Sequence, residues 1–184
     1  MSSHASAVPR QASVACTGTV AAVPAQAALA RTISQRSPLP PSGHHPVLGQ
    51  AWPLRDGIEL SPVPAAVRRA RLHSRHVLGD WGLRGLSGDA ELLVSELTTN
   101  AIAAVQSITV PATTLPVRMW LLADTRRVLV LVWDPSSRPP VLADSGQDAE
   151  NGRGLQIVQA VSQLWDWYQP QNATGKIVWA LAAL

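Results

Sequence analysis

The sequence predicts an α+β domain, a two-layer sandwich in which a mixed, mainly antiparallel sheet carries helices on one face. Three observations lead to this prediction. Two stretches with helical periodicity come first, at residues 62–79 and 87–106. Two strand-like stretches, 117–124 and 127–134, follow across a short turn and indicate a hairpin. A third helix and two more strands complete an order typical of helices gathered on one side of a sheet.

The chain divides near residue 51. Residues 1–50 are rich in Ala, Ser, Pro and Thr and lack any helical or strand period, so we expect a disordered or loosely attached tail before a domain at 51–184. A signal peptide is the alternative for this tail, with Arg10 as its charged region, 12–25 as its apolar region and AQA at 25–27 as the cleavage site. Pro24 and several polar residues interrupt that apolar region, which favours the tail.

Charge and cysteine content narrow the class of protein. The net charge is +3, but three of the fifteen basic residues lie in 1–50, where there is no acidic residue. The domain therefore has twelve of each sign, which argues against direct nucleic-acid binding. No apolar run is long enough to span a membrane. We therefore expect no membrane partner. Cys16 is the single cysteine, which excludes an intrachain disulfide and fits a reducing compartment, so a cytoplasmic protein is expected.

The first strand and the first helix are expected between residues 51 and 82. A short strand is predicted in 51–60. Pro62 and Pro64 mark the opening of a helix, because proline is tolerated in the first turn. Its buried stripe consists of Val63, Val67, Ala70 and Val77, and Gly79 and Gly82 end it.

The second helix is expected at 87–106. Ser87 can cap it, and acidic residues at 89 and 91 suit the positive end of its dipole. Its buried stripe consists of Leu93, Leu97, and Ala101 or Ala104. After the hairpin, a loop is predicted at 135–150, a helix at 154–164, and strands at 164–169 and 176–184 across a turn at 172–175.

Glu96 and Asn100 lie four residues apart on the second helix and so share one face with Leu93 and Leu97. They are either half-solvated boundary residues or a polar pair directed into a pocket. In a pocket, the Asn100 oxygen could bind a hard cation such as Mg²⁺, and Glu96 could deprotonate or orient a nucleophile. Asp134 ends an apolar strand, where it either caps a turn or accepts a hydrogen bond from a ligand amine.

The stretch NGRGLQIV, from residue 151 to 158, places two glycines at the start of a helix. Glycines let the backbone approach a phosphate, and the helix start offers free N–H groups. The pattern is not a dinucleotide-binding fingerprint, which would need a third glycine where Ile157 stands. Nor is Gly175–Lys176 a P-loop, since Ile177 and a strand follow it.

Taken in order, these motifs resemble the GHKL ATPase superfamily, and within it the small anti-sigma-factor serine kinases of actinobacteria. LLVSELTTNAI at 92–102 resembles the N box, VWDPSSRPP at 132–140 the first glycine box, and GRGLQIVQAVSQLWDW at 152–167 the second. WGL at 81–83 and GKIVW at 175–179 are also similar to that branch. The resemblance covers about 51–184 and implies the Bergerat-type fold of a histidine kinase-like ATP-binding domain.

The resemblance implies roles for individual residues. Asn100 would coordinate Mg²⁺ between the ATP phosphates, Glu96 would be the catalytic base, and Asp134 would bind the adenine amino group. Residues 135–151 would form a lid. The remaining ATP-binding residues would be Gly152, Gly154 and Leu155 at the phosphates, Ser136 after the aspartate, and Thr174 and Lys176 near the adenine. Arg153 would either contact phosphate or face water.

Two positions depart from the family pattern. Ser136 stands where the larger family has glycine, and 102–104 read IAA where relatives have a basic residue or histidine. The resemblance implies an ATP- and Mg²⁺-dependent serine/threonine-protein kinase that phosphorylates a STAS-type anti-anti-sigma protein, with a sigma factor as a further partner and a homodimer left open. The alternative is a catalytically weak or inactive nucleotide-binding switch that acts by docking a partner. A plain α+β interaction domain is the third reading.

Overall fold

The computed structural model describes residues 47–108, 115–142, 153–171 and 173–184. These residues form five strands, three α-helices and one short 3-10 helix. In chain order they are β1 (Leu54–Leu60), α2 (Ala65–Asp80), η1 (Arg84–Leu86), α3 (Ser87–Gln106), β2 (Val117–Ala123), β3 (Arg127–Asp134), α4 (Gly154–Val161), β4 (Leu164–Tyr168) and β5 (Lys176–Ala183). The α+β class is therefore confirmed.

The strands form one sheet in the order β1-β2-β3-β5-β4. Every pairing among them is antiparallel, so the prediction of a mixed sheet is wrong for the described part of the chain. The register places Leu131 of β3 opposite Trp179 of β5, and Tyr168 of β4 opposite Ile177. The last strand thus inserts between β3 and β4, and its first residue, Lys176, lies beside Asp134, the last residue of β3.

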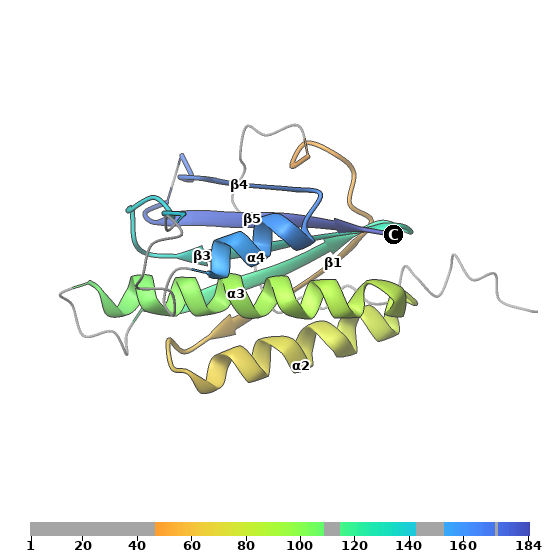
Figure 1. Ribbon diagram of the computed structural model, residues 1–184, viewed down its shortest axis with the longest axis horizontal. Coiled ribbons are helices and arrows are strands. Elements are labelled where there is room, and N and C mark those ends of the chain that lie inside the picture. The colour runs from red at the N-terminus through yellow and green to blue at the C-terminus, as the bar shows by residue number, and fades with distance from the viewer. Residues whose placement is uncertain (1–46, 109–114, 143–152, 172) are drawn as a thin grey trace, which may run out of the picture.

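The three α-helices lie on one face of the sheet, as predicted (Figure 1). Leu93 and Leu97 of α3 pack against inward-facing strand residues such as Met119 and Val130. All four of these side chains are at most 2% exposed. Burial of this apolar face is the main term that holds the two layers together.

The end of α2 follows from its glycines. The amide of Gly82 donates to the carbonyl of Gly79 at 3.2 Å, and the amide of Leu83 donates to Leu78 at 2.8 Å. These two bonds are the Schellman arrangement, which needs a left-handed residue after the helix. Gly82 supplies it, with a φ of 74°. The prediction that Gly79 and Gly82 end this helix is confirmed, since α2 ends at Asp80 and Trp81 is its C-cap.

Several local predictions are wrong. Ser87 does not cap α3: η1 runs directly into the helix, the N-cap is Leu86, and no side chain bonds there. Val63 precedes α2 and is 43% exposed. Of the two alternatives in α3, Ala101 is buried, at 3% exposed, and Ala104 is not. The last helix ends at Val161, because Ser162 takes an extended conformation that leads Leu164 into β4.

The packed region begins before residue 51. Val47 is 8% exposed and lies in an apolar cluster with Trp52, whose indole N–H donates to the Val47 carbonyl at 3.0 Å. Residues 1–46 of the predicted tail lie outside the described residues.

Candidate functional site

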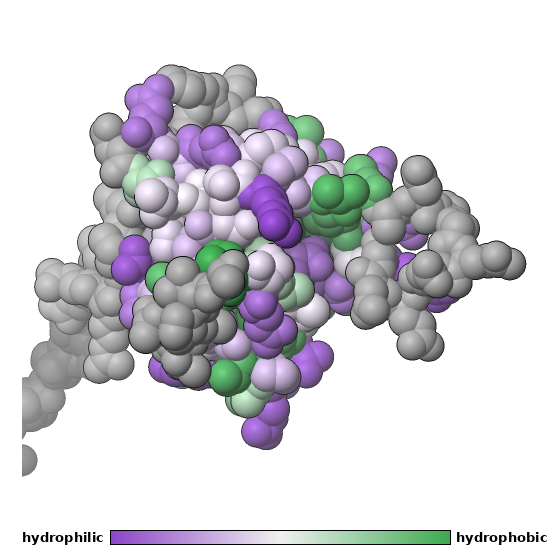
Figure 2. All heavy atoms as spheres, turned by 90° about the vertical axis from the view of Figure 1, so that its left-hand side faces the viewer, coloured by the Kyte–Doolittle hydropathy of each residue, from purple (hydrophilic) through white to green (hydrophobic). Residues whose placement is uncertain are grey.

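A pocket of about 230 Å³ opens at the end of the domain where β3 stops and β5 starts. Its walls are the C-terminal half of α3, the loop after β3, the start of α4 and the first residues of β5. Figure 2 shows this end of the molecule, where hydrophilic side chains cover most of the coloured surface and hydrophobic ones form small separate groups. Six of the predicted site residues line the pocket: Asn100, Asp134, Ser136, Gly154, Leu155 and Lys176.

Glu96 and Asn100 meet the start of α4. A Cβ atom added to Gly154 would lie 2.8 Å from Oε2 of Glu96 and 3.3 Å from Oδ1 of Asn100. These distances are shorter than ordinary van der Waals contact, so only glycine fits here without displacing the polar pair. The predicted close approach of Gly154 is therefore present, and the groups it approaches are the two side chains of α3. The first turn of α4 is thereby held against Glu96 and Asn100.

The Asn100 amide nitrogen is buried and has no hydrogen-bond partner among the described residues. A buried donor left unpaired costs about 1–3 kcal/mol. Because Asn100 lines the pocket, a ligand there could supply the missing partner. Rotation of the amide by half a turn would present its oxygen instead, so this side chain suits either an anionic oxygen or a cation.

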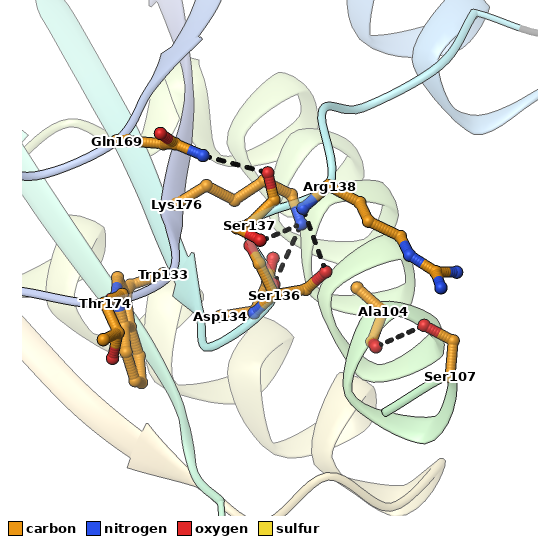
Figure 3. Close-up of polar contacts among 10 residues, drawn as sticks. All are labelled: Ala104, Ser107, Trp133, Asp134, Ser136, Ser137, Arg138, Gln169, Thr174 and Lys176. Carbon is orange, nitrogen blue, oxygen red and sulfur yellow. Dashed lines mark hydrogen bonds and ion pairs between the residues drawn. The ribbon is translucent and has the colours of Figure 1, made fainter. Parts of the chain in front are cut away.

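Asp134 is almost fully enclosed, at 1% exposed, and its Oδ1 atom has two donors (Figure 3). Nζ of Lys176 donates to it at 2.9 Å, and the backbone N–H of Ser136 donates at 2.9 Å. Burial raises the pKa of Asp134, although Lys176 and the Ser136 N–H favour the ionised form and act in the opposite direction. No described residue donates to the Oδ2 atom, which leaves it as an acceptor at the pocket wall.

Gly175 makes this ion pair geometrically possible. Its φ is 89°, and an added Cβ would collide with the carbonyl oxygen of Asp134 and lie 2.9 Å from Cα of Pro135. The turn before β5 therefore passes directly against the backbone after β3. Such contact, together with a positive φ, requires glycine. It brings Lys176 within reach of Asp134, 42 residues earlier in the chain.

The loop after β3 is fixed at its beginning. The amide of Arg138 donates to the Ser136 hydroxyl at 3.3 Å, and the side chain of Gln169 donates to the Ser137 carbonyl at 3.0 Å. Residues 135–142 of the predicted lid are described, and they form one wall of the pocket through Arg138, Pro139, Pro140 and Val141. Residues 143–151 of that lid lie outside the described residues.

The structure does not bring every predicted residue to the pocket. Glu96 lies against Gly154, beside the pocket, but its side chain is not part of the pocket wall. Thr174 is exposed, and its carbonyl accepts a hydrogen bond from the Trp133 indole at 3.0 Å, on the side away from the cavity (Figure 3). Arg153 is exposed at the N-cap of α4 and does not line the pocket. Gly152 lies outside the described residues.

Sequence reasoning missed Arg138 and Ser107. Arg138 lines the pocket, and its guanidinium points away from the Asp134–Lys176 pair (Figure 3). The position of a basic residue in the loop after Asp134 could have predicted a positive charge at the opening of the pocket. Ser107, at the C-cap of α3, lines the pocket while its hydroxyl donates to the Ala104 carbonyl at 2.8 Å. Nothing in the sequence pattern distinguished it from any other helix-ending serine.

Comparison with known proteins finds no match: no family profile matches the chain, and no curated protein matches it. The described part of the chain contains no helix long and apolar enough to cross a membrane. Within the same residues, no three His, Cys, Asp or Glu side chains gather closely enough to hold a metal ion by themselves.

Proposed function

We propose that this protein binds ATP with Mg²⁺ in the pocket and acts as a serine/threonine-protein kinase of the anti-sigma-factor type. One observation supports this most. Polar groups from three distant segments converge on one cavity: Oδ2 of Asp134 and the amide nitrogen of Asn100, neither of which has a partner among the described residues, and the start of α4 at Gly154. Their chemistry matches an amino-bearing base at one end and phosphates at the other.

The size of the pocket suits part of a nucleotide. At about 230 Å³ it is below the roughly 300–1,000 Å³ of sites that enclose a whole ligand. We place the adenine inside, with its amino group donating to Oδ2 of Asp134 and its ring between Val132 and Leu97. The phosphates then lie at the mouth, where the N–H groups of α4 and the Asn100 amide face them.

Phosphoryl transfer needs little from the protein beyond position and charge. The hydroxyl oxygen of a serine on the partner forms a bond to the γ-phosphorus, and the bond from that phosphorus to the β–γ bridging oxygen breaks. Glu96 takes the hydroxyl proton. Mg²⁺, when bound through Asn100 and the phosphates, would neutralise the charge that develops on the leaving ADP. Gly154 keeps Glu96 at the start of α4, beside the reacting phosphate.

The protein substrate we propose is a STAS-type anti-anti-sigma protein, with a sigma factor as a second partner. This part of the proposal comes from the resemblance of the ELTTN, VWDPSSRPP and GRGLQIV motifs. The balanced charge of residues 51–184 supports a protein partner over a nucleic acid.

Calorimetric titration with ATP in the presence of Mg²⁺ tests the proposal. Wild-type protein should bind, and Asp134→Asn should bind about ten- to a hundredfold more weakly, because a hydrogen bond to a charged group is worth about 1.5–3 kcal/mol. Asp166→Asn, an exposed position on β4, is the matched control and should bind normally. Absence of binding at saturating ATP would eliminate both the nucleotide site and the kinase.

Glu96→Gln separates binding from catalysis. The amide cannot take the hydroxyl proton, so this variant should keep its affinity for ATP and lose most of its phosphoryl transfer, by about a hundredfold or more. The measurement is transfer of labelled phosphate to a purified STAS-type partner. Unchanged transfer would show that Glu96 is not the base.

A nucleotide-binding switch without transfer is the second candidate, and the Asp134–Lys176 ion pair favours it. Oδ1 of Asp134 is already committed to Lys176 and Ser136, and Ser136 is buried where the family pattern has glycine. A site built this way can hold a nucleotide by one acceptor and still fail to align it for transfer. Wild-type protein that binds ATP and the partner but transfers no phosphate would establish this alternative.

A further inference from the structure

The exposed side of α2 concentrates positive charge. With histidine neutral, four arginines against one acidic residue, Asp80, give this helix a net charge of +3. The rest of residues 51–184 has eight basic and eleven acidic residues, a net charge of −3. The domain is neutral as a whole, but its positive charge is in excess on this one helix, at Arg68, Arg69, Arg71 and Arg75. Such segregation favours a partner of the opposite sign.

Leu72 lies exposed in the middle of this charge. It is 49% exposed, on the side of α2 that faces away from the core. On a helix, the surface neighbours of a residue stand three and four positions away. For Leu72 these are Arg68, Arg69, Arg75 and His76, and all four are exposed. We call these five residues the basic face of α2.

Contacts within the chain neutralise only part of the basic face. Nε of Arg75 donates to Oε1 of Glu91 in α3 at 2.7 Å. Arg68 and Arg69 form no ion pair with any residue that the structure describes. Arg71 stands three residues after Arg68 and four before Arg75, and like charges at this spacing weaken a helix, so helix formation does not account for them. Two guanidinium groups, each shaped to hold a carboxylate by two hydrogen bonds, are thus available to a partner.

We propose that the basic face of α2 is a docking surface for an acidic amphipathic helix of a partner protein. On any helix, side chains three or four residues apart lie about 5–6 Å from each other. Asp or Glu residues at these spacings therefore match the arginines of α2, while an apolar residue between them covers Leu72. An apolar contact bordered by arginines is typical of the centre of a protein interface.

A nucleic acid and a membrane suit this surface less well. Duplex DNA carries one charge per about 1.7 Å, so it needs basic surface well beyond one helix, and the rest of the domain has a net charge of −3. A helix that binds a membrane inserts its apolar side. The apolar side of α2 is buried in the core, at Ala66, Ala70, Val77 and Leu78. A protein partner, which needs only the exposed side, fits best.

The docking surface is separate from the pocket. In the helix layer, α3 lies between α2 and α4 (Figure 1). The walls of the pocket come from α3, α4, the sheet and the loop after β3, and no described residue of α2 belongs to them. A partner on α2 therefore leaves the pocket open. The inference thus goes beyond the proposed kinase, and docking can be measured without ATP.

Calorimetric titration of the full-length protein with a synthetic peptide tests the proposal. The peptide has about 15 residues, with Glu on both sides of a row of Leu, and its control carries Gln in place of every Glu. The acidic peptide should bind, and Arg68→Glu should weaken binding about tenfold or more, because it replaces an attraction by a repulsion. Arg126→Glu, which changes an exposed arginine of the β2–β3 turn and alters the net charge equally, should not. Equal weakening by the two variants, equal binding of the Gln peptide, or no binding at all would overturn the proposal.

Two further measurements separate a docked helix from diffuse attraction between charges. Leu72→Ala keeps every charge and should weaken binding about threefold or more, because apolar burial is lost. Leu92→Ala is the control, since Leu92 is 39% exposed on α3, outside the basic face. Equal effects of these two variants would contradict the central role of Leu72.

Duplex DNA of about 20 base pairs and vesicles of phosphatidylcholine with phosphatidylserine are the competing ligands. At the same salt concentration, both should bind more weakly than the acidic peptide. Tighter binding of either one that is lost in Arg68→Glu would make a nucleic acid or a membrane the partner and would refute the docking of an acidic helix.

Discussion

Nζ of Lys176 lies 2.9 Å from Oδ1 of Asp134 at the wall of the pocket, and both side chains are at most 6% exposed. A buried ion pair of this kind is weak evidence for stability, because desolvation offsets much of the attraction. Its clearer consequence is orientation. With Oδ1 held by Lys176 and Ser136, the other carboxylate oxygen remains for a ligand. We therefore regard Lys176 as a positioning residue for Asp134, which makes the expected place near the adenine more specific.

The affinity for ATP should depend on the ionisation of Asp134. Burial raises the pKa of this carboxyl above its ordinary 3.8, although Lys176 opposes the shift. The ionised form accepts the ligand amine, so binding should weaken as the pH falls through this raised pKa. Lys176→Met removes a group that favours ionisation and should move the loss of binding to higher pH. Calorimetric titrations across a pH series measure both effects. If Lys176→Met loses ATP binding at a lower pH than the wild type, Lys176 does not favour the ionised form of Asp134.

Gly154→Ala should impair transfer more than stability. Its new methyl group would push the Glu96 carboxylate, which lies 2.8 Å from the Cβ position, but the end of a long side chain can move at little cost. Alanine also favours a helix by about 1 kcal/mol over glycine. We expect a melting temperature near that of the wild type and at least a tenfold loss of phosphoryl transfer. Gly88→Ala, where the added Cβ meets nothing within 4 Å, is the control.

Gly175→Ala should destabilise the fold. The residue has a φ of 89°, and an added Cβ would collide with the backbone of Asp134 and Pro135. Gly82→Ala provides a close control, because its φ is 74° but open space surrounds it. That control should lose about 1 kcal/mol in the free energy of unfolding, and Gly175→Ala about 3 kcal/mol or more. Urea denaturation measures both; equal losses would mean that the backbone contact is unimportant.

Asn100→Leu should stabilise the unliganded protein while it weakens ATP binding. The substitution removes a buried amide that has no partner among the described residues, a change worth about 1 kcal/mol or more. Thr98→Val is the comparison: its hydroxyl is also buried without a described partner, but it does not line the pocket. Both variants should melt at higher temperature, and only Asn100→Leu should lose affinity for ATP. Full affinity in Asn100→Leu would remove Asn100 from the site.

Local sequence signals were sufficient for most of the fold. The end of α2 depends on Gly82 and two neighbouring hydrogen bonds, so it could be predicted from a short stretch. In the β2–β3 hairpin, the Asp124 carboxylate accepts hydrogen bonds from the backbone amides of Arg126 and Arg127. These contacts join residues at most three positions apart, so a local pattern can predict them. The predicted cap at Ser87 shows the limit of such local prediction. The η1 turn runs directly into α3, so Ser87 lies inside the helix and does not cap it.

The apolar run VLVLV in β3 carried information that the two-layer prediction did not use. A continuous apolar strand is typical of burial on both faces, and Leu129 and Leu131 are fully buried on the outer one. If only the face toward the helices were covered, apolar and polar residues would be expected to alternate along β3.

The sequence by itself determined the elements and the order of the motifs, because periodicity, glycines and prolines act over a few residues. Only the tertiary structure decided which side chains meet. Asn100 lies against the start of α4 because Gly154 leaves room for its side chain, and Lys176 reaches Asp134 because Gly175 lets the turn before β5 pass against the backbone after β3. It also turned Thr174 away from the pocket and placed Arg138 at its wall. Contacts between residues far apart in the chain depend on packing, and no local pattern encodes their distances.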